Sequence, residues 1–189
     1  MKYYLVILFT SITFLTFSQG FKGGVFAGFV ASQVDGDEYG GYNKAGFQAG
    51  AYSKFYFNKR FFLLNELKYI QKGSSQTFKE FPEENFKIKV SYIEVPFILG
   101  FQLNEKFSFG SGFSYGVLIG AEQQDGGGVI PKDRLGYKNY DLNILLHMKY
   151  QFNEHFWFNP KIGYSILPIN DVSPRQFNNL ISASFGYEF

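Results

Sequence analysis

The chain has 189 residues, and its 25 Phe, 14 Tyr and single Trp make 21% of it aromatic, against 18% charged residues and no cysteine. One domain is expected at this length, and a chain that is 46% apolar is too hydrophobic to be intrinsically disordered. The lack of cysteine excludes disulfides, Cys-ligated metals and thiol catalysis. The formal net charge is only +2, so the chain lacks the excess of basic residues typical of a nucleic-acid-binding protein, and no nucleic-acid partner is expected.

The first residues have the pattern of an export signal. Lys2 supplies a positive charge, residues 5–15 are apolar apart from three hydroxyl residues, and Thr16 and Ser18 place small side chains before a cleavage point. This apolar run is too short to span a membrane in the mature protein. We therefore expect a signal peptide over residues 1–18, followed by one exported domain over residues 19–189.

From residue 20 onward, apolar residues alternate with small or polar residues at a period of two, which indicates β-strands. Eight segments follow this pattern: residues 21–32, 44–57, 61–72, 87–102, 107–121, 140–152, 156–169 and 177–189. Each reaches the roughly 9 to 11 residues that a tilted strand needs to cross a bilayer. The low mean hydropathy of −0.12 fits this interpretation, because lipid-facing and lumen-facing residues average out along such strands.

The connections between these segments alternate between short and long. Three short turns, over residues 57–61, 103–107 and 152–156, share one pattern of an apolar residue, Asn, two polar residues and Phe. The other four connections are longer and polar: residues 33–43, 73–86, 122–139 and 170–176. Asn suits tight turns, and short turns opposite long loops are typical of outer-membrane barrels. We predict an all-β, eight-stranded antiparallel up-and-down transmembrane barrel with its termini and short turns in the periplasm.

The parity of the strands predicts which side chains face lipid. In the last segment, Ile181, Phe185 and Phe189 share one face, whereas small and polar residues occupy the other. A water-soluble barrel, the alternative architecture, would have apolar residues inside and charges outside. The same parity directs a polar set into the lumen: Lys54, Glu66, Lys68, Glu94, His147, Lys149, Lys161 and Glu188. Because an unpaired charge costs several kcal/mol in a low-dielectric lumen, we expect these residues to form a paired network.

Two other functions remain open at this point. Inward charges could line a narrow pore for ions or small solutes, although eight strands leave an interior just wide enough for side chains. His147 could serve a lipid hydrolase, but nucleophilic catalysis needs a hydroxyl within reach, and none follows His147 locally. We therefore expect a protein that is not an enzyme, with no catalytic residue and no cofactor.

The long loops are the expected interaction surface, because binding residues concentrate on loops that a rigid scaffold holds in place. Asp35, Asp37, Glu38 and Tyr42 lie in the first loop. Their carboxylates lack the remaining oxygen ligands of a calcium loop, so no metal site is expected. The Gly-rich segment 123–131 is expected to be a mobile surface loop that also contributes to binding.

Several stretches carry a family resemblance: residues 32–37 and 41–46, the run Glu-Leu-Lys-Tyr-Ile-Gln-Lys-Gly at 66–73, and Tyr-Ile-Glu-Val-Pro at 92–96. With the aromatic strand that ends at Phe189, they resemble the PorT-like family of outer-membrane barrels in the Bacteroidetes. The resemblance implies insertion by the outer-membrane assembly machinery, which reads the terminal strand, and so assigns Phe189 to an insertion signal. Outer-membrane lipid and other outer-membrane proteins are the implied partners. Secretion, the role of the founding member, follows by analogy alone.

Overall fold

The computed structural model describes residues 20–78, 85–125, 128–131 and 136–189. The expected signal peptide, residues 1–18, lies outside these ranges. The strands are β1 (Phe21–Asp35), β2 (Lys44–Tyr56), β3 (Phe61–Gln76), β4 (Phe86–Gln102), β5 (Phe107–Asp125), β6 (Gly128–Pro131), β7 (Tyr140–Gln151), β8 (Phe156–Ser165) and β9 (Phe177–Glu188). Within the described part of the chain, no helix is long and apolar enough to cross a membrane.

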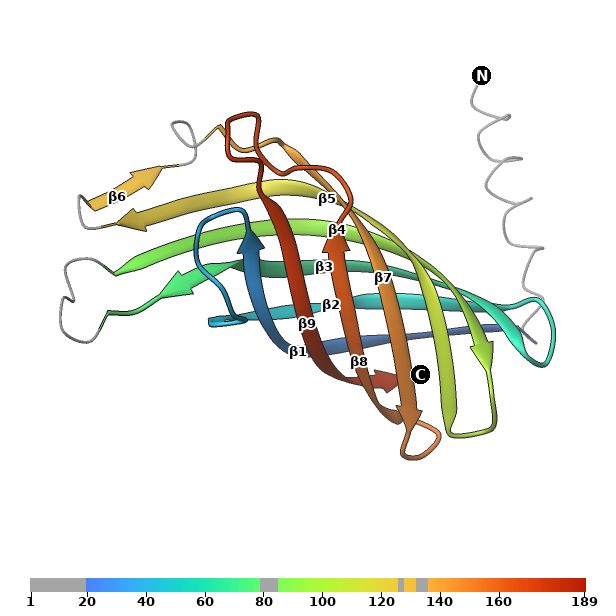
Figure 1. The fold of residues 1–189 in the computed structure, drawn as a ribbon. Coiled ribbons are helices and arrows are strands. Elements are labelled where there is room, and N and C mark those ends of the chain that lie inside the picture. The colour runs from blue at the N-terminus through green and yellow to red at the C-terminus, as the bar shows by residue number, and fades with distance from the viewer. Residues whose placement is uncertain (1–19, 79–84, 126–127, 132–135) are drawn as a thin grey trace, which may run out of the picture.

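Eight of these strands close into an antiparallel barrel (Figure 1). Each strand pairs with the next one around the wall, β5 pairs with β4 and β7, and β9 returns to pair with β1. The predicted eight-stranded up-and-down barrel is therefore confirmed. The turns 57–60, 103–106 and 152–155 lie at one end of the barrel, together with residues 20 and 189, and we call this the short-turn end. The opposite end is the long-loop end.

The ninth strand, β6, corrects one expectation. Residues 123–131, expected as a mobile loop, instead contribute the end of β5 and all of β6, which pair from Glu122 opposite Pro131 to Asp125 opposite Gly128. The polar, Gly-rich composition of this segment concealed the strand preference of Val129 and Ile130. The pair extends the β5 edge beyond the closed barrel (Figure 1).

Strand ends at the long-loop end also differ from the prediction. Strands β1, β3 and β5 continue three or four residues farther than the sequence pattern, because their backbone groups stay paired after the side-chain alternation weakens. Strand β8 is shorter and ends at Ser165 rather than residue 169. Beyond it, Ile169 leaves the wall and is fully buried in an apolar cluster inside the barrel mouth. The sequence pattern did not distinguish this inward turn from a longer strand.

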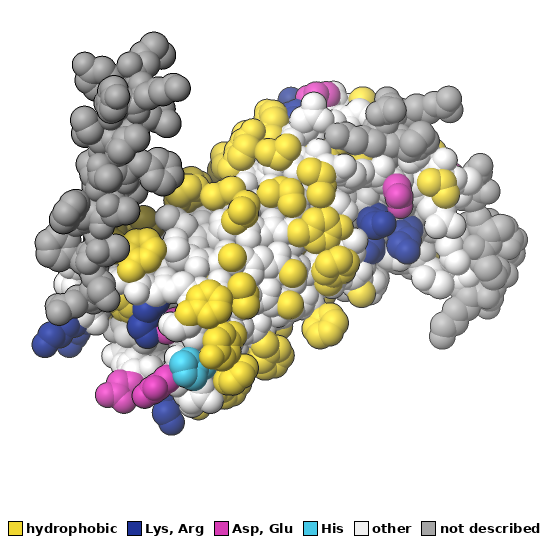
Figure 2. Space-filling model, turned by 180° about the vertical axis from the view of Figure 1, so that it is seen from behind, with side chains coloured by type: hydrophobic (Ala, Val, Ile, Leu, Met, Phe, Trp, Pro, Cys, Tyr) yellow, Lys and Arg dark blue, Asp and Glu magenta, His cyan; other side chains and the backbone are white. Residues whose placement is uncertain are grey.

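The outer wall is apolar between two polar ends. Outward side chains such as Phe29, which is 78% exposed, alternate with buried ones along every barrel strand. Figure 2 shows the apolar side chains gathered in a band across the wall, with the charged groups on that face collected toward its two ends. This arrangement excludes the water-soluble alternative, in which the outward row would be polar.

The interior contains more apolar material than expected. We predicted an interior of small residues and paired charges. Both are present, but two apolar clusters also occupy the interior. The first, at the long-loop end, consists of Val30, Val34, Ile70, Ile88, Val90, Tyr92, Leu118, Ala121, Ile169 and Leu180. The second, toward the short-turn end, consists of Phe26, Tyr52, Phe62, Leu64, Ile98, Leu145 and Trp157. Along β3, Glu66 and Lys68 lie between the two clusters, so a charged layer is enclosed by apolar layers.

Candidate functional site

The charged layer is centred on Lys72, whose side chain is fully buried. Its Nζ lies 2.6 Å from Glu94 Oε1 and 3.0 Å from Asp141 Oδ2, and it donates a hydrogen bond to Asn143 Oδ1 at 3.2 Å. Lys68 Nζ adds a second cation 3.4 Å from the other oxygen of Glu94. Because Lys72 belongs to β3 and Asp141 to β7, this cluster joins walls that are not neighbours in the sheet.

A second bridge crosses the lumen beside it. Lys161 on β8 donates a hydrogen bond to Glu66 on β3, and both side chains are almost completely buried. Buried pairs of this kind are costly to break, because the remaining partner becomes an uncompensated charge. The lumen is therefore braced across its width as well as around its wall.

His147 lies inside the barrel, in a cavity that offers it no serine or threonine hydroxyl. One of its ring nitrogens, Nδ1, is 2.7 Å from Asn159 Nδ2, and Glu66 lines the same small cavity. The space of about 10 Å³ in that cavity has room for at most about one water molecule. An ester substrate cannot enter such a space.

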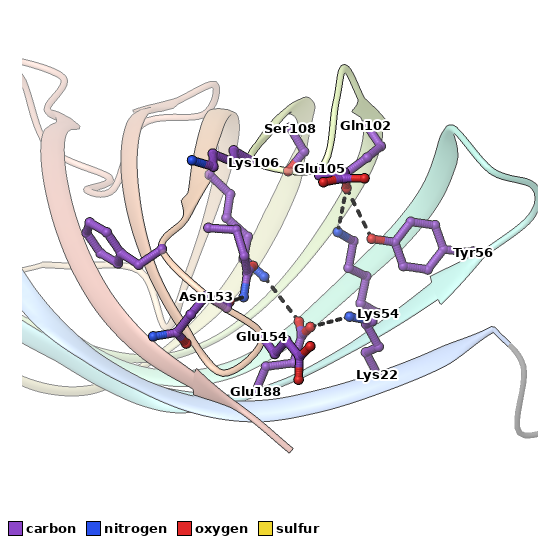
Figure 3. A pocket seen from close by; sticks show the side chains of 13 residues that line it. Lys22, Lys54, Tyr56, Gln102, Glu105, Lys106, Ser108, Asn153, Glu154 and Glu188 are labelled. Carbon is purple, nitrogen blue, oxygen red and sulfur yellow. Dashed lines mark hydrogen bonds and ion pairs between the residues drawn. The ribbon is translucent and has the colours of Figure 1, made fainter.

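The mouth at the short-turn end holds the remaining charged residues of the predicted set (Figure 3). Glu188 accepts hydrogen bonds from Lys22 at 2.6 Å, from Lys149 at 3.1 Å and from the Tyr52 hydroxyl at 3.0 Å. Lys54 donates to Gln102 Oε1 at 3.2 Å instead. The charged groups and Gln102 line an open pocket of about 300 Å³.

Aromatic rings separate this pocket from the charged layer. Lys54 Nζ lies 3.8 Å from the centre of the Phe62 ring, and Lys149 Nζ lies 5.0 Å from that of Trp157. The Trp157 ring nitrogen donates to the Tyr52 hydroxyl at 3.1 Å. The cations of the mouth therefore rest against the apolar cluster that closes this half of the lumen.

The first loop places its four candidate residues differently. Asp35 accepts hydrogen bonds from Gln33 and, at 3.3 Å, from Asn179, whose Oδ1 accepts the Tyr42 hydroxyl at 2.8 Å. Asp37 turns inward, where its Oδ1 accepts the Tyr39 N–H at 3.0 Å and burial raises the pKa of its carboxyl above the usual range. Glu38 stays exposed. Asp35 and Tyr42 thus both form hydrogen bonds with Asn179, whereas the buried Asp37 bonds to the backbone of the loop at Tyr39.

Sequence reasoning missed the centre of the network. Lys72 and Asp141 were not in the predicted set, although Lys72 has the parity of Lys68 and Asp141 has that of His147. Asp141 also accepts hydrogen bonds from Ser165 at 2.7 Å and Asn178 at 2.8 Å. Applying the parity rule to the ends of the strands would have found both residues. In the described ranges, no group of three or more His, Asp and Glu residues could hold a metal ion.

A closed barrel with an aromatic outer wall and a charged interior defines the class of small outer-membrane barrels. The chain belongs to the family described as outer membrane protein beta-barrel domain, whose model matches residues 13–173. No curated protein sequence is similar enough to this chain to count as a match. The family places the protein in the outer membrane.

Solved structures share the fold. Ail, the attachment invasion locus protein of Yersinia pestis, is 18% identical, with 90% of this chain and 99% of Ail covered at a TM-score of 0.58. Neisserial surface protein A is 15% identical, with 90% of this chain and all of that protein covered at a TM-score of 0.61. Ail in complex with the heparin analogue sucrose octasulfate is also similar, at 15% identity and a TM-score of 0.56, with 90% of this chain and 100% of that one covered. At these identities the similarity concerns the fold alone.

Proposed function

We propose that this protein is a non-enzymatic, non-conducting barrel that serves as a platform for a partner at its long-loop end. The filled interior carries the proposal. Two apolar clusters enclose a charged layer in which Lys72 and Lys161 contact carboxylates across the lumen. A solute passing through would have to displace both clusters and separate buried ion pairs.

The proposal includes an orientation. The short turns and both termini face the periplasm, residues 1–18 are removed on export, and the assembly machinery reads the strand that ends at Phe189. The position of Phe189 supports this role, since its side chain is 78% exposed on the outside of the barrel and its N–H bonds to Gly23 O at 2.9 Å in β1. The terminal strand thus displays its aromatic row where it closes the sheet.

The first loop supports partner binding. Tyr42 and Glu38 are exposed, and the bond from Tyr42 to Asn179 ties the loop to β9. A loop held in this way loses little conformational entropy on binding. The PorT-like resemblance suggests another outer-membrane protein as the partner, in a complex such as one for secretion, and this step rests on analogy. Ail, solved with sucrose octasulfate, is an example of a barrel of this fold that binds a ligand.

Crosslinking in intact outer membranes tests the platform. A photoreactive residue at Tyr42 is expected to capture an outer-membrane protein in specific yield, whereas one at lipid-facing Phe29 is expected to capture lipid. Deletion of residues 38–42 should abolish co-purification of the captured protein. A Tyr42 probe that captures no protein, combined with a silent loop deletion, would count against partner binding.

Single-channel recording tests the pore alternative. Purified wild-type protein in a planar bilayer is expected to show no stable conductance, because apolar side chains fill the lumen on both sides of the charged layer. A reproducible unit conductance that changes when Glu94 is replaced by glutamine would establish a conduction path and overturn the non-conducting assignment.

A further inference from the structure

The lipid-facing wall has a hollow near the short-turn end. Outward residues of β5 are large on both sides of Ser111, with Phe109 before it and Phe113 after it. Opposite Ser111 lie Leu99 on β4 and Leu146 on β7. The small side chain therefore leaves an apolar groove of about 620 Å³, which we call the wall groove. Its apolar outward-facing lining consists of Phe57, Phe61, Leu99, Phe101, Phe109 and Leu146.

One end of the wall groove adjoins a basic turn. Phe57 and Phe61 line the groove, and the residues between them, Asn58, Lys59 and Arg60, form the β2–β3 turn. Both basic side chains are exposed. Asn58 Oδ1 holds the turn by accepting the N–H groups of Arg60 and Phe61, each at 2.9 Å. Two cations are thus held at the polar edge of an apolar groove.

The other short turns lack this charge. The β4–β5 turn has Glu105 and Lys106, and the β7–β8 turn has Glu154 and His155, so neither carries a net positive charge. Both are held by their asparagines in the same way as the first turn. The β4–β5 turn joins strands that also line the groove through Phe101 and Phe109, but its net charge is zero. The net positive charge at the groove therefore comes from the β2–β3 turn, and the turn geometry does not require it.

We propose that the wall groove and the β2–β3 turn together bind one anionic glycerophospholipid. An acyl chain lies in the groove over Ser111, and the phosphate of the headgroup accepts hydrogen bonds from Arg60 and Lys59 at the membrane edge. Arginine presents a planar fork that matches phosphate, and apolar side chains match the acyl chain. The site requires only that the barrel lie in a membrane and is independent of the partner-binding role proposed above.

A second copy of the chain fits the groove less well. Barrels inserted in the same direction and related by a two-fold axis would bring the same patch together on both copies. Lys59 and Arg60 of one copy would then approach the same cations of the other. An anionic lipid instead neutralises this charge, and acyl chains already surround the wall in a membrane.

Native mass spectrometry of the full barrel tests the site. The purified protein is placed in vesicles containing equal amounts of phosphatidylglycerol and phosphatidylcholine, released in mild detergent and weighed with its retained lipid. We expect one retained phosphatidylglycerol, favoured over phosphatidylcholine by about tenfold. K59E/R60H gives this turn the Asn-Glu-His sequence of the β7–β8 turn, so the turn should still form while the preference is lost. S111F fills the groove and should abolish retention of either lipid.

Two matched variants control for general effects. K87Q/K89Q removes two positive charges at the long-loop end, and A183F adds a ring to the outward row of β9, so both should retain phosphatidylglycerol as the wild type does. Heat-shifted mobility on gels verifies the fold of each variant, and S111L replaces S111F if the latter does not fold. Equal retention of the two lipids by the wild type, an unchanged preference in K59E/R60H, or a crosslinked dimer across the groove would overturn the site.

Discussion

Replacing Lys72 with methionine is expected to lower the free energy of unfolding by about 3–5 kcal/mol. The substitution removes the cation that contacts both Glu94, at 2.6 Å, and Asp141, at 3.0 Å. Glu94 retains Lys68, but Asp141 retains only neutral hydrogen-bond donors in a buried layer. Urea unfolding of the vesicle-inserted barrel, followed by the fluorescence of Trp157, the single tryptophan, measures the loss.

The matched control is Lys89→Met at the same end of the barrel but on the outer face of β4. Lys89 Nζ lies 3.5 Å from Glu122, but both side chains are exposed, so its loss should change stability by less than about 1 kcal/mol. Adding Asp141→Asn to Lys72→Met should recover part of the stability, because the uncompensated carboxylate is removed along with its cation. If Lys72→Met cost no more than Lys89→Met, the charged layer would contribute nothing to the stability of the fold.

The wall of this barrel could be predicted from the sequence, because alternation with a period of two identifies each strand and also the face on which each side chain lies. The ion pairs that cross the lumen could not be predicted in this way. Glu66 and Lys161 are 95 residues apart, and Lys72 and Asp141 are 69 apart. Whether two inward side chains on distant strands lie at one height depends on the stagger of the closed sheet, which the pattern within a single strand does not encode.

The two mouths were harder still to predict. Ile169 fits the alternating pattern, yet it turns into the lumen and packs with Val34 and Tyr92, because the open end exposes apolar side chains that need cover. At the other end, strand parity alone places Tyr52 and Trp157 inward. Their packing depends on which cross-strand residue lies opposite each ring, and this is a property of register.

Three inward rings lie opposite glycines on neighbouring strands. Tyr52 pairs with Gly24, Phe62 with Gly100, and Trp157 with Gly186. A Cβ on Gly100 would lie 2.0 Å from Phe62 Cζ, and one on Gly186 would lie 2.1 Å from Trp157 Cζ2. The rings therefore cover the bare backbone of the next strand. This explains how eight strands enclose such large side chains without widening the barrel.

Trp157→Ala is accordingly expected to lower the free energy of unfolding by about 3–5 kcal/mol, since it leaves a cavity in the apolar cluster toward the short-turn end. Gly186→Ala should cost about 1–3 kcal/mol, because a rigid ring must move away from the new methyl group. Far-UV circular dichroism during urea unfolding measures all variants, including those without tryptophan.

The double variant separates this packing from a general intolerance of β9 to substitution. Once Trp157 is alanine, the ring atoms that lie nearest to a methyl group at position 186 are gone, so Gly186→Ala should cost less than about 0.5 kcal/mol in that background. Trp157→Phe provides the intermediate case, because it keeps a ring over Gly186 but loses the hydrogen bond to the Tyr52 hydroxyl. Strictly additive losses would mean that the ring and the glycine are not coupled, and the layer between the mouth and the charged residues would then need another source of rigidity.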